Sequence, residues 1–460
     1  MKPILTAAAM RVAEARAVAA GTSVETLMDR AGTAAAEAIR LHSGLGAVLV
    51  LCGPGNNGGD GYVIARRLRE AGLSVRVAAL GAPKEGAAAL ARQAWGDATE
   101  ELASAAPASV LVDALFGTGL TRGLDAVVAA DLNRLAAGAR VRVAVDLPSG
   151  VATDDGALLS PVPDFDLTIT FATLKPAHRL QPAARHMGRV VVADIGIEAE
   201  SDLTAIGRPH LPAPGPDDYK YSRGYAAILA GEMPGASALA ASAAARGGAG
   251  YVRLIAHAPV HGIPHAVVQA EGEARALLAE ERIDALAVGP GLGRTPRAEA
   301  LLDRGLAAGH RLVLDADALV LLARRGPDAL ATLEHLPILT PHAGEFGRLH
   351  PDGAGSKLDR ARDAAADWGA VIVFKGADTV VAAPDGRAAI AALAPAWLAS
   401  AGTGDVLTGV TAAMRARGLG AFEAACAAVW LHARAAEIVG PALIADDLLA
   451  ALPIALAECL

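Results

Sequence analysis

Aromatic residues and cysteine are both scarce in this chain of 460 residues. Phe, Tyr and Trp together make up 3% of the sequence, so the core must be built from Leu, Val, Ile and Ala. The three cysteines, Cys52, Cys426 and Cys459, lie far apart and form no Cys-x-x-Cys pair. This usage indicates reduced thiols in a reducing compartment.

The sequence also lacks a long apolar run and a basic region. No stretch approaches the roughly 18 apolar residues that a membrane-spanning helix needs, so we expect no membrane association. The net charge is −8 with acids and bases interspersed, which argues against a nucleic-acid partner. Arg11, Glu14 and Arg16 interrupt the apolar residues of the N-terminal segment, which is typical of an amphipathic helix rather than a signal peptide. We expect a cytoplasmic protein.

Short apolar runs alternate with Ala-rich helical segments along the whole chain. Such alternation predicts a parallel sheet with helices on both faces, and strands covered on both faces are nearly all-apolar. The predicted strands are Ala47–Leu51, Val75–Ala79, Val110–Val112, Val141–Val145, Leu167–Phe171 and Arg189–Val192 in the first half, and Tyr225–Ala230, Tyr251–Ile255, Ala285–Val288, Leu312–Leu314, Pro337–Leu339 and Val371–Phe374 in the second.

The alternation stops between Arg208 and Gly224, where four prolines lie within Pro209–Pro216. A stretch so rich in proline and polar residues is typical of a linker. A chain of this length also exceeds what one hydrophobic core usually serves. We therefore predict an α/β protein with two domains, residues 1–208 and 224–460, joined by a linker at 209–223. Each domain is expected to have a mostly parallel sheet covered by helices.

The stretch "VLVLCGPGNNGGDGYVIARRL" contains Gly53-x-Gly55-x-x-Gly58, which formally matches the dinucleotide-binding fingerprint. A Rossmann loop also needs an acid at the end of the second strand to hold the ribose hydroxyls. Here "VRVAALGAPKEG" has no acid at that position, and Glu85 comes later. The fingerprint is therefore incomplete, and a glycine turn before a helix remains the alternative explanation.

Polar residues follow the other strands of the first half. Asp113 comes after the third predicted strand, and Asp146 and Ser149 come after the next. Ligands of doubly wound sheets bind outside the carboxyl ends of the strands, so we expect one crevice there. The residues expected to converge on it are Asn56, Asn57, Asp60, Asp113, Asp146 and Ser149. Each aspartate could instead be a helix cap.

The chemistry of these groups suggests two roles. The oxygens of Asn57, Asp113 and Ser149 suit a hard monovalent or divalent cation. Asp146 is left as a candidate acid or base. Lys175, just past the strand in "TITFATLKPAH", is either within reach of the same crevice or a surface lysine.

Four stretches in order, "LTAAAMRVAEARAVAAGTSVETLMDRAG", "GPGNNGGDGYVIARRL", "DALFGTGLTRG" and "VDLPSG", resemble the NAD(P)H-hydrate epimerase domain. The resemblance covers residues 1–200 and implies a Rossmann-like fold. It implies that the Asn-Asn-Gly-Gly-Asp loop lies on a hydrated dinucleotide, and that Asn57, Asp113 and Ser149 hold K⁺. The implied substrate contacts are Asn56, Asn57, Gly58, Gly59, Asp60, Gly117, Thr118, Gly119, Leu120, Thr121, Arg122, Gly123 and Asp146.

The dinucleotide would then be a damaged substrate rather than a redox cofactor. Hydration at C6 of the nicotinamide leaves a hydroxyl beside the ring nitrogen, and exchange of its two faces needs proton movement on that oxygen, by ring opening or by loss and return of water. Asp146 is the candidate carrier of this proton, with Lys175 as a second candidate. Glu14 stands where the family often has Asp.

The second half contains no Gly-x4-Gly-Lys-[Ser/Thr] motif, which excludes a P-loop protein. Instead, "AGTGDVLTG" places Gly402–Asp405 at the start of a predicted helix, where backbone N–H groups can cradle an anion. Asp405 is either a capping acid or a base that takes a proton from a substrate hydroxyl during phosphoryl transfer. Further candidates near strand ends or helix starts are Gly235, Ala236, Gly289, Gly291, Gly293, His342, Glu345, Lys375 and Gly376.

"LTPHAGEF" and "AGTGDVLTG" resemble the ADP-dependent NAD(P)H-hydrate dehydratase domain, of ribokinase-like fold, over residues 220–460. The resemblance implies Mg²⁺ bound with ADP. The implied dehydratase substrate contacts are Ala236, Gly293, His342 and Asp405. The implied contacts to the AMP part of ADP are Lys375, Gly376, Ala377, Asp378, Thr379 and Gly404. "YKYSRGYAAIL" departs from the family's usual His-Lys-Gly, so no role is assigned to Lys220.

We therefore predict a bifunctional repair enzyme. Its first domain would epimerise the R and S forms of hydrated NADH and NADPH, and its second would dehydrate the S form with ADP, giving NAD(P)H, AMP and phosphate. A kinase for a stable small alcohol and a dinucleotide sensor are the alternatives, and the retained Asp146 and Asp405 argue against a sensor. We also expect a homo-oligomer. Pro259 and Pro264 interrupt the His257, His261, His265 spacing, so no metal site is expected there.

Overall fold

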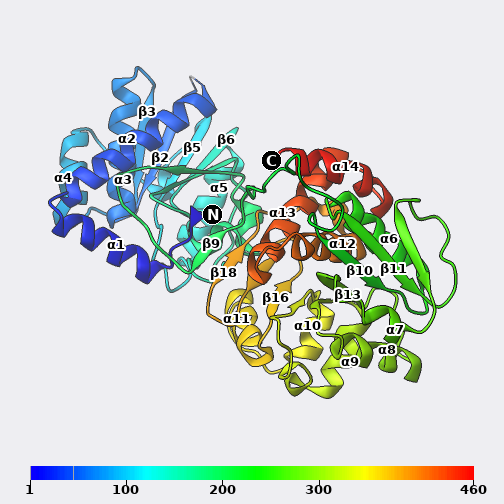
Figure 1. Ribbon diagram of the computed structural model, residues 1–460. Coiled ribbons are helices and arrows are strands. Elements are labelled where there is room, and N and C mark those ends of the chain that lie inside the picture. The colour runs from blue at the N-terminus through cyan, green and yellow to red at the C-terminus, as the bar shows by residue number, and fades with distance from the viewer. Residues whose placement is uncertain (1, 45) are drawn as a thin grey trace. The chain divides into compact units, whose positions relative to one another are not determined.

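A computed structural model describes residues 2–44 and 46–460. Contacts divide the chain into two compact units, an N-terminal unit, Lys2–Leu203, and a C-terminal unit, Thr204–Leu460. In Figure 1 the N-terminal unit runs from blue to cyan-green and the C-terminal unit from green to red. Within the described chain, no helix combines the length and the apolar character needed to cross a bilayer.

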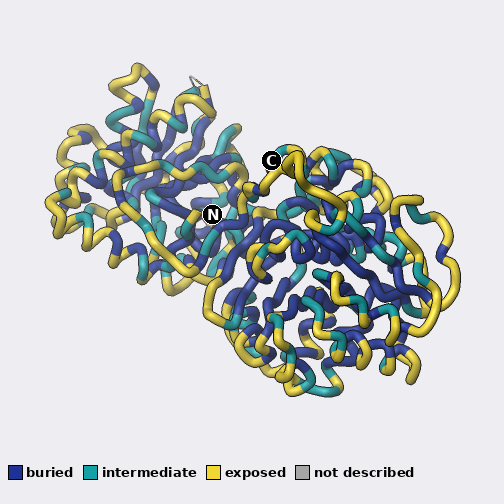
Figure 2. The backbone as a smooth tube through the Cα atoms, in the orientation of Figure 1, coloured by how far each residue is buried: buried dark blue, intermediate teal, exposed yellow. Residues whose placement is uncertain are grey.

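The N-terminal unit is built on a seven-stranded sheet of order β4-β3-β2-β5-β6-β7-β8, in which neighbouring strands are parallel. Every residue of β2, β5 and β7 is buried, which explains why these strands are mostly apolar, with Asp113 in β5 and two threonines in β7 as the exceptions. Figure 2 shows this buried sheet as dark tube. The strands are β2 (Val48–Cys52), β3 (Val75–Ala79), β4 (Glu100–Glu101), β5 (Val110–Ala114), β6 (Val141–Val145), β7 (Leu167–Phe171) and β8 (Arg189–Ala193), with the short β1 (Lys2–Pro3) before them.

Alternate residues of the central strand face opposite layers of helices. Val50 of β2 packs in one cluster with Ile39 and Ile64, from the two helices on one face. Leu49 and Leu51 pack in a second cluster with Leu132 and Leu135 of the helix on the other face. The helices are α1 (Ala7–Ala19), α2 (Val24–Ser43), α3 (Asn56–Glu70), α4 (Gly86–Trp95) and α5 (Ala126–Ala137), with 3₁₀ turns η1 (Leu102–Ser104), η2 (Pro176–His178) and η3 (Ala183–His186).

The C-terminal unit has a sheet of order β9-β18-β17-β16-β15-β14-β13-β10-β11-β12. Neighbouring strands in the part of the sheet ordered β16-β15-β14-β13-β10-β11-β12 are parallel, while β17 pairs antiparallel with both of its neighbours. The strands are β9 (Leu203–Ala205), β10 (Tyr225–Leu229), β11 (Tyr251–Ala256), β12 (Val267–Glu271), β13 (Ala285–Val288), β14 (Arg311–Leu314), β15 (Ile338–Leu339), β16 (Val371–Phe374), β17 (Val380–Ala382) and β18 (Ala388–Ile390).

The helices α6, α12, α13 and α14 form the main core of this unit with the sheet, and α12 is buried along most of its length. In Figure 1, α8, α9 and α10 lie on the other side of the strands. The helices are α6 (Pro234–Arg246), α7 (Ala274–Leu278), α8 (Pro296–Leu306), α9 (Asp317–Arg325), α10 (Ala343–Leu349), α11 (Lys357–Trp368), α12 (Thr403–Ala416), α13 (Ala421–Val439) and α14 (Ala445–Ala457), with η4 (Pro327–Leu330) and η5 (Ala396–Leu398).

The predicted architecture, two mostly parallel sheets covered by helices, is confirmed. All the predicted strands are present, with ends that differ by one or two residues. The segment 209–223 contains no helix or strand, and within it Leu211 is 2% exposed and packs in the core of the C-terminal unit. Its backbone N–H donates to the Cys459 carbonyl at 2.8 Å.

Candidate functional site

The carboxyl ends of β6 and β7 bring Asp146 and Lys175 together. Lys175 Nζ lies 2.7 Å from Asp146 Oδ1 and also donates to Thr170 Oγ1 at 2.8 Å and to the Phe171 carbonyl at 3.1 Å. On the other carboxylate oxygen, Oδ2, Asp146 accepts hydrogen bonds from the backbone N–H and the hydroxyl of Thr118. Lys175 is 1% exposed, so it is not a surface lysine.

The environment keeps Asp146 ionised. Burial by itself would raise its pKa, but the Lys175 ammonium and the hydrogen bonds from Lys175 and Thr118 outweigh burial and hold the pKa well below its usual range. The Asp146 backbone has φ 64°, a left-handed conformation that costs free energy for a residue other than glycine. The strain lies at the residue that carries the candidate chemistry.

The His178 ring forms hydrogen bonds with the backbones of both Lys175 and Asp146. Its Nδ1 accepts from the Lys175 N–H at 2.8 Å, so its Nε2 carries the proton and donates to the Asp146 carbonyl, also at 2.8 Å. Burial lowers the pKa of His178 to about 4, which keeps the ring neutral. Sequence analysis missed this residue, because a histidine three positions after a lysine carries no signal of such a role.

Asp113 and Ser149 form the centre of the predicted cation site. Both are fully buried, and Asp113 accepts from the Ser149 hydroxyl at 2.7 Å and from its N–H at 2.8 Å. Burial raises the pKa of Asp113 to about 6, so a nearby cation would stabilise its ionised form. The Asn57 side-chain amide nitrogen is buried without a hydrogen-bond partner among the described residues. The oxygens of these carboxylate, hydroxyl and amide groups, rather than the unpartnered nitrogen, fit a hard cation.

A cavity of about 400 Å³ in the N-terminal unit is lined by Asp146 and Lys175, whereas Asp113 and Ser149 are not among its lining residues. The predicted residues that line it are Asn56, Asn57, Asp60, Gly117, Thr118, Gly119, Leu120, Asp146 and Lys175. The remaining predicted substrate contacts, Gly58, Gly59, Thr121, Arg122 and Gly123, are not among its lining residues. Arg11 and Glu14, from α1, line it as well and had no assigned role.

The Asn-Asn-Gly-Gly-Asp stretch, expected as a loop, is the first turn of α3. Its glycines serve close packing. A Cβ on Gly58 would lie 1.9 Å from the Gly53 carbonyl oxygen, and a Cβ on Gly59 would lie 2.5 Å from the terminal methyl of Met28. Side chains at these two positions would therefore push the start of α3 away from the sheet and from α2.

Asp405 lies in the first turn of α12 in the C-terminal unit. The helix begins after Gly402, which has φ 86°, and no side chain caps it, so the capping explanation for Asp405 is not supported. Its carboxylate forms no hydrogen bond with the described part of the chain. Burial and the neighbouring Asp315 raise its pKa to about 6, against the opposing charge of Lys375. A carboxylate with such a pKa is suited to accept a proton near neutrality.

Two carboxylates that sequence analysis missed, Asp315 and Asp317, follow β14. Asp315 is fully buried, and its two oxygens accept from Lys375 Nζ at 2.8 Å and from the Thr408 hydroxyl at 2.6 Å. Ala316, between the two aspartates, has φ 49°, a strained backbone conformation. The "LDAD" stretch directly after a predicted strand was the available signal, by the same reasoning that identified Asp113 and Asp146.

A cavity of about 650 Å³ lies beside the start of α12. The predicted residues that line it are His342, Lys375, Gly376, Ala377, Thr379 and Gly404. Ala236, Gly293, Asp378 and Asp405 are not among its lining residues. Asp378 is instead paired with Lys357 at 2.6 Å, and the Gly293 N–H donates to Asp317 at 3.0 Å. His342 is the N-cap of α10, where its Nδ1 accepts from the Gly344 N–H at 2.9 Å.

Family models and curated relatives match this chain over most of its length. Residues 24–177 match the family model described as YjeF-related protein N-terminus, and residues 226–450 match that of NAD(P)H-hydrate dehydratase. The bifunctional NAD(P)H-hydrate repair enzyme Nnr of Salinibacter ruber is 36% identical over 99% of this chain and 96% of its own length. The chain belongs to the bifunctional NAD(P)H-hydrate repair enzyme family. The Escherichia coli enzyme of the same name is 34% identical over 91% of this chain and 86% of its own.

Solved structures also resemble part of this chain. A ribokinase-like superfamily protein from Enterococcus faecalis aligns with a TM-score of 0.51 and 23% identity, over 57% of this chain and 98% of that one, which shows the ribokinase-like fold. An ADP/ATP-dependent NAD(P)H-hydrate dehydratase from Bacillus subtilis, co-crystallised with ATP and Mg²⁺, has a TM-score of 0.49 and 32% identity over 55% of this chain and 95% of its own.

Proposed function

We propose that this chain repairs hydrated NADH and NADPH in two steps. The N-terminal unit epimerises the R and S forms, and the C-terminal unit dehydrates the S form with ADP, giving NAD(P)H, AMP and phosphate. One observation carries this proposal: each unit has its own cavity with acid–base groups at or next to it. Asp146 and Lys175 line the first, and Asp405 directly follows Gly404, which lines the second. Membership of the repair-enzyme family over nearly the whole chain supports it.

In the N-terminal unit the reacting atom is the oxygen on C6 of the hydrated ring. Ring opening and loss of water both require that this oxygen exchange a proton with the protein. The Lys175 ammonium is the proton donor to a departing hydroxyl, and the amine left behind takes a proton back from the returning water. The Asp146 carboxylate, kept ionised by its partners, stabilises positive charge on the ring nitrogen when the hydroxyl leaves.

The implied K⁺ would be held by Asn57, Asp113 and Ser149. Their role toward the substrate is indirect: the Ser149 hydroxyl accepts from the Phe116 N–H at 2.9 Å, next to the Gly117–Gly119 segment of the cavity wall. When bound, the cation would neutralise the Asp113 carboxylate and fix this segment.

In the C-terminal unit Asp405 takes the proton of the C6 hydroxyl. The oxygen attacks the β-phosphorus of ADP, the bond from that phosphorus to the bridging oxygen breaks, and AMP leaves. The lone pair of the ring nitrogen then expels phosphate from C6, and loss of a proton from C5 restores the dihydropyridine. The backbone N–H groups at the start of α12, together with Lys375, would hold the phosphates. Lys375 and Thr379 line the cavity of about 650 Å³, which would take the AMP part of ADP.

Mg²⁺ would enter with ADP. Besides burial, the negative charges of Asp315, Asp317 and Glu345 raise the pKa of Asp405. Their carboxylates offer the hard oxygens that Mg²⁺ prefers. When bound, the ion would neutralise charge on the phosphates during transfer.

The test of this proposal supplies hydrated NADH with ADP or with ATP and follows both NADH absorbance and phosphorylated products. We expect NADH, AMP and phosphate in equal amounts with ADP. A persistent phosphorylated alcohol without NADH would instead favour a kinase for a stable small alcohol.

Epimerisation is expected to depend on K⁺. Exchange of K⁺ for a bulky organic cation should reduce R-to-S exchange by about tenfold or more, because the buried Asp113 then lacks its counter-charge. NMR of the hydrated nucleotide measures this exchange, and dehydration of the pure S form is the control. Ser149→Ala should lower the apparent affinity for K⁺, and an exchange rate indifferent to K⁺ would remove the cation from the proposal.

A cytoplasmic location, a homo-oligomeric assembly and the domain limits at 208 and 224 stay predictions from the sequence.

A further inference from the structure

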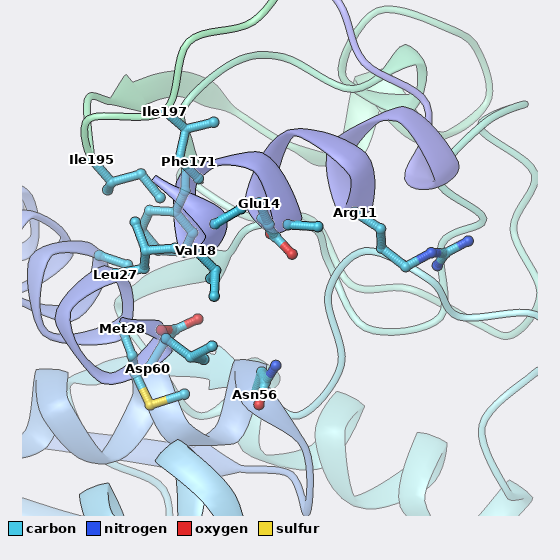
Figure 3. A pocket seen from close by; sticks show the side chains of 14 residues that line it. Arg11, Glu14, Val18, Leu27, Met28, Asn56, Asp60, Phe171, Ile195 and Ile197 are labelled. Atoms are coloured by element: carbon cyan, nitrogen blue, oxygen red, sulfur yellow. The ribbon is translucent and has the colours of Figure 1, made fainter. Parts of the chain in front are cut away.

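A second, largely apolar cavity of about 490 Å³ lies in the N-terminal unit between α1, α2 and the start of α3 (Figure 3). Its apolar lining consists of Ala15, Val18, Ala19, Val24, Leu27, Met28, Ala31, Phe171, Ile195 and Ile197. Val18 and Val24, at its edge, are each 41% exposed. A concave apolar surface with a few polar groups is typical of a binding site for a flat organic ligand.

This cavity adjoins the polar one beside Asp146 and Lys175. Arg11, Glu14, Asn56, Asp60 and Phe171 line both of them. Two adjoining cavities of this kind suit the two ends of one long ligand. The hydrated dinucleotide has that form, because it carries two heterocyclic rings joined by a pyrophosphate.

We propose that the apolar cavity is the subsite for the adenine ring of the dinucleotide. This inference rests on the proposed epimerase function, which requires the hydrated ring beside Asp146 and Lys175 and so leaves the adenine ring for the second cavity. A purine buries two flat apolar faces, and side chains such as Leu27, Phe171 and Ile197 would cover them.

Two carboxyl groups supply the polar contacts that a purine edge needs. Figure 3 shows Glu14 and Asp60 pointing into the cavity from opposite sides. Neither forms a hydrogen bond with any residue of the described chain, so both are available to a ligand. The exocyclic amine of adenine is a donor that such oxygens accept.

The environment of Asp60 also favours a hydrogen-bond donor such as the exocyclic amine of adenine. Burial, and then the charges of Asp146 and Glu14, raise its pKa well above the usual range, against the opposing charge of Lys175. A donor such as the adenine amine would stabilise the ionised carboxylate in this environment. Hypoxanthine carries a carbonyl oxygen, which is an acceptor, in place of this amine.

The place where the cavities meet suits the pyrophosphate. Arg11 lines both cavities and forms no ion pair with a described residue. The helix α3 begins here at Asn56, and no side chain caps it. Its first N–H groups would therefore face a bound anion between the two rings, while the Arg11 guanidinium lies towards Gly119 on the wall of the polar cavity.

The test is a substitution at the edge of the cavity, Val18→Trp, with Val12→Trp as control. Both positions lie on α1 and are exposed, but Val12, at 60% exposure, does not line the cavity. The substrates are hydrated NADH and hydrated nicotinamide mononucleotide, which lacks the adenylate half. For Val18→Trp we expect the ratio of kcat/KM between dinucleotide and mononucleotide to fall about tenfold through KM, because the indole fills the subsite. AMP should inhibit the wild type competitively and the variant much less.

A second measurement does not depend on a variant. Hydrated nicotinamide hypoxanthine dinucleotide should show a KM about tenfold above that of hydrated NADH, because its carbonyl oxygen at C6 cannot donate to the Glu14 or Asp60 oxygens as the adenine amine does. An unchanged ratio in Val18→Trp, or an equal loss for dinucleotide and mononucleotide, would overturn the adenine subsite. A wild type that epimerises neither substrate would instead overturn the proposed function.

Discussion

Replacing Asp405 by asparagine is expected to reduce ADP-driven formation of NADH by about 10²- to 10⁴-fold, because the C6 hydroxyl loses its general base. Epimer exchange should continue at the wild-type rate, since it takes place in the other unit. Absorbance of NADH measures the first reaction and NMR of the hydrated nucleotide the second. Asp328→Asn is the matched control, because Asp328 is exposed in the same unit. Loss of both reactions in Asp405→Asn would contradict the two-site account.

The pH dependence of dehydration gives the same residue a second test. Burial and Asp315 raise the pKa of Asp405 to about 6, and only its ionised form can accept a proton. In the wild type, kcat/KM for the S form should therefore fall as the pH drops through about 6 and level off above it. A profile that stays flat from pH 5 to about 8 would exclude this role.

Replacing Asp146 by asparagine should abolish epimerisation and also destabilise the N-terminal unit. The Lys175 ammonium, 1% exposed, would keep no ionised partner. Removing one member of a buried ion pair costs about 3–5 kcal/mol in free energy of unfolding. Urea unfolding measures this cost, and dehydration of pure S epimer should stay intact wherever the unit remains folded.

The control for this variant is Asp125→Asn, in the same unit. Asp125 is exposed at the start of α5 and forms no capping hydrogen bond there. The Asp125→Asn substitution removes one negative charge, as Asp146→Asn does, but leaves the ion pair of Lys175 unchanged. An unchanged epimerisation rate in Asp146→Asn would take Asp146 out of the mechanism.

The strands could be predicted because burial on both faces leaves a direct mark on sequence. Val48–Cys52 and Leu167–Phe171 are short apolar or Thr-containing runs, and strands packed between two helix layers have no face left for charged residues. The edge strand β12 was not predicted, because most of its residues are exposed and its sequence "VVQAE" lacks the continuous apolar run of a buried strand. The antiparallel β17 and β18 are three residues each, too short for a periodic signal.

The candidate site was predictable where side chains follow strands. Asp113, Asp146 and Lys175 were found in this way, and the structure brings Asp146 and Lys175 into contact. His178 could not be found, because its role depends on two backbone groups, of Lys175 and Asp146, that only the folded chain brings together. The apolar cavity of Figure 3 was also invisible in the sequence, since residues such as Val18 and Ile197 carry no chemical signal.

The most direct test of two independent sites supplies only the R epimer of hydrated NADH, with ADP, to the Asp146→Asn and Asp405→Asn variants. Neither variant alone should form NADH faster than uncatalysed epimerisation allows. An equal mixture of the two should form it at a rate near that of the wild type, because each variant supplies the step that the other lacks. A mixture no faster than either variant alone would contradict the account.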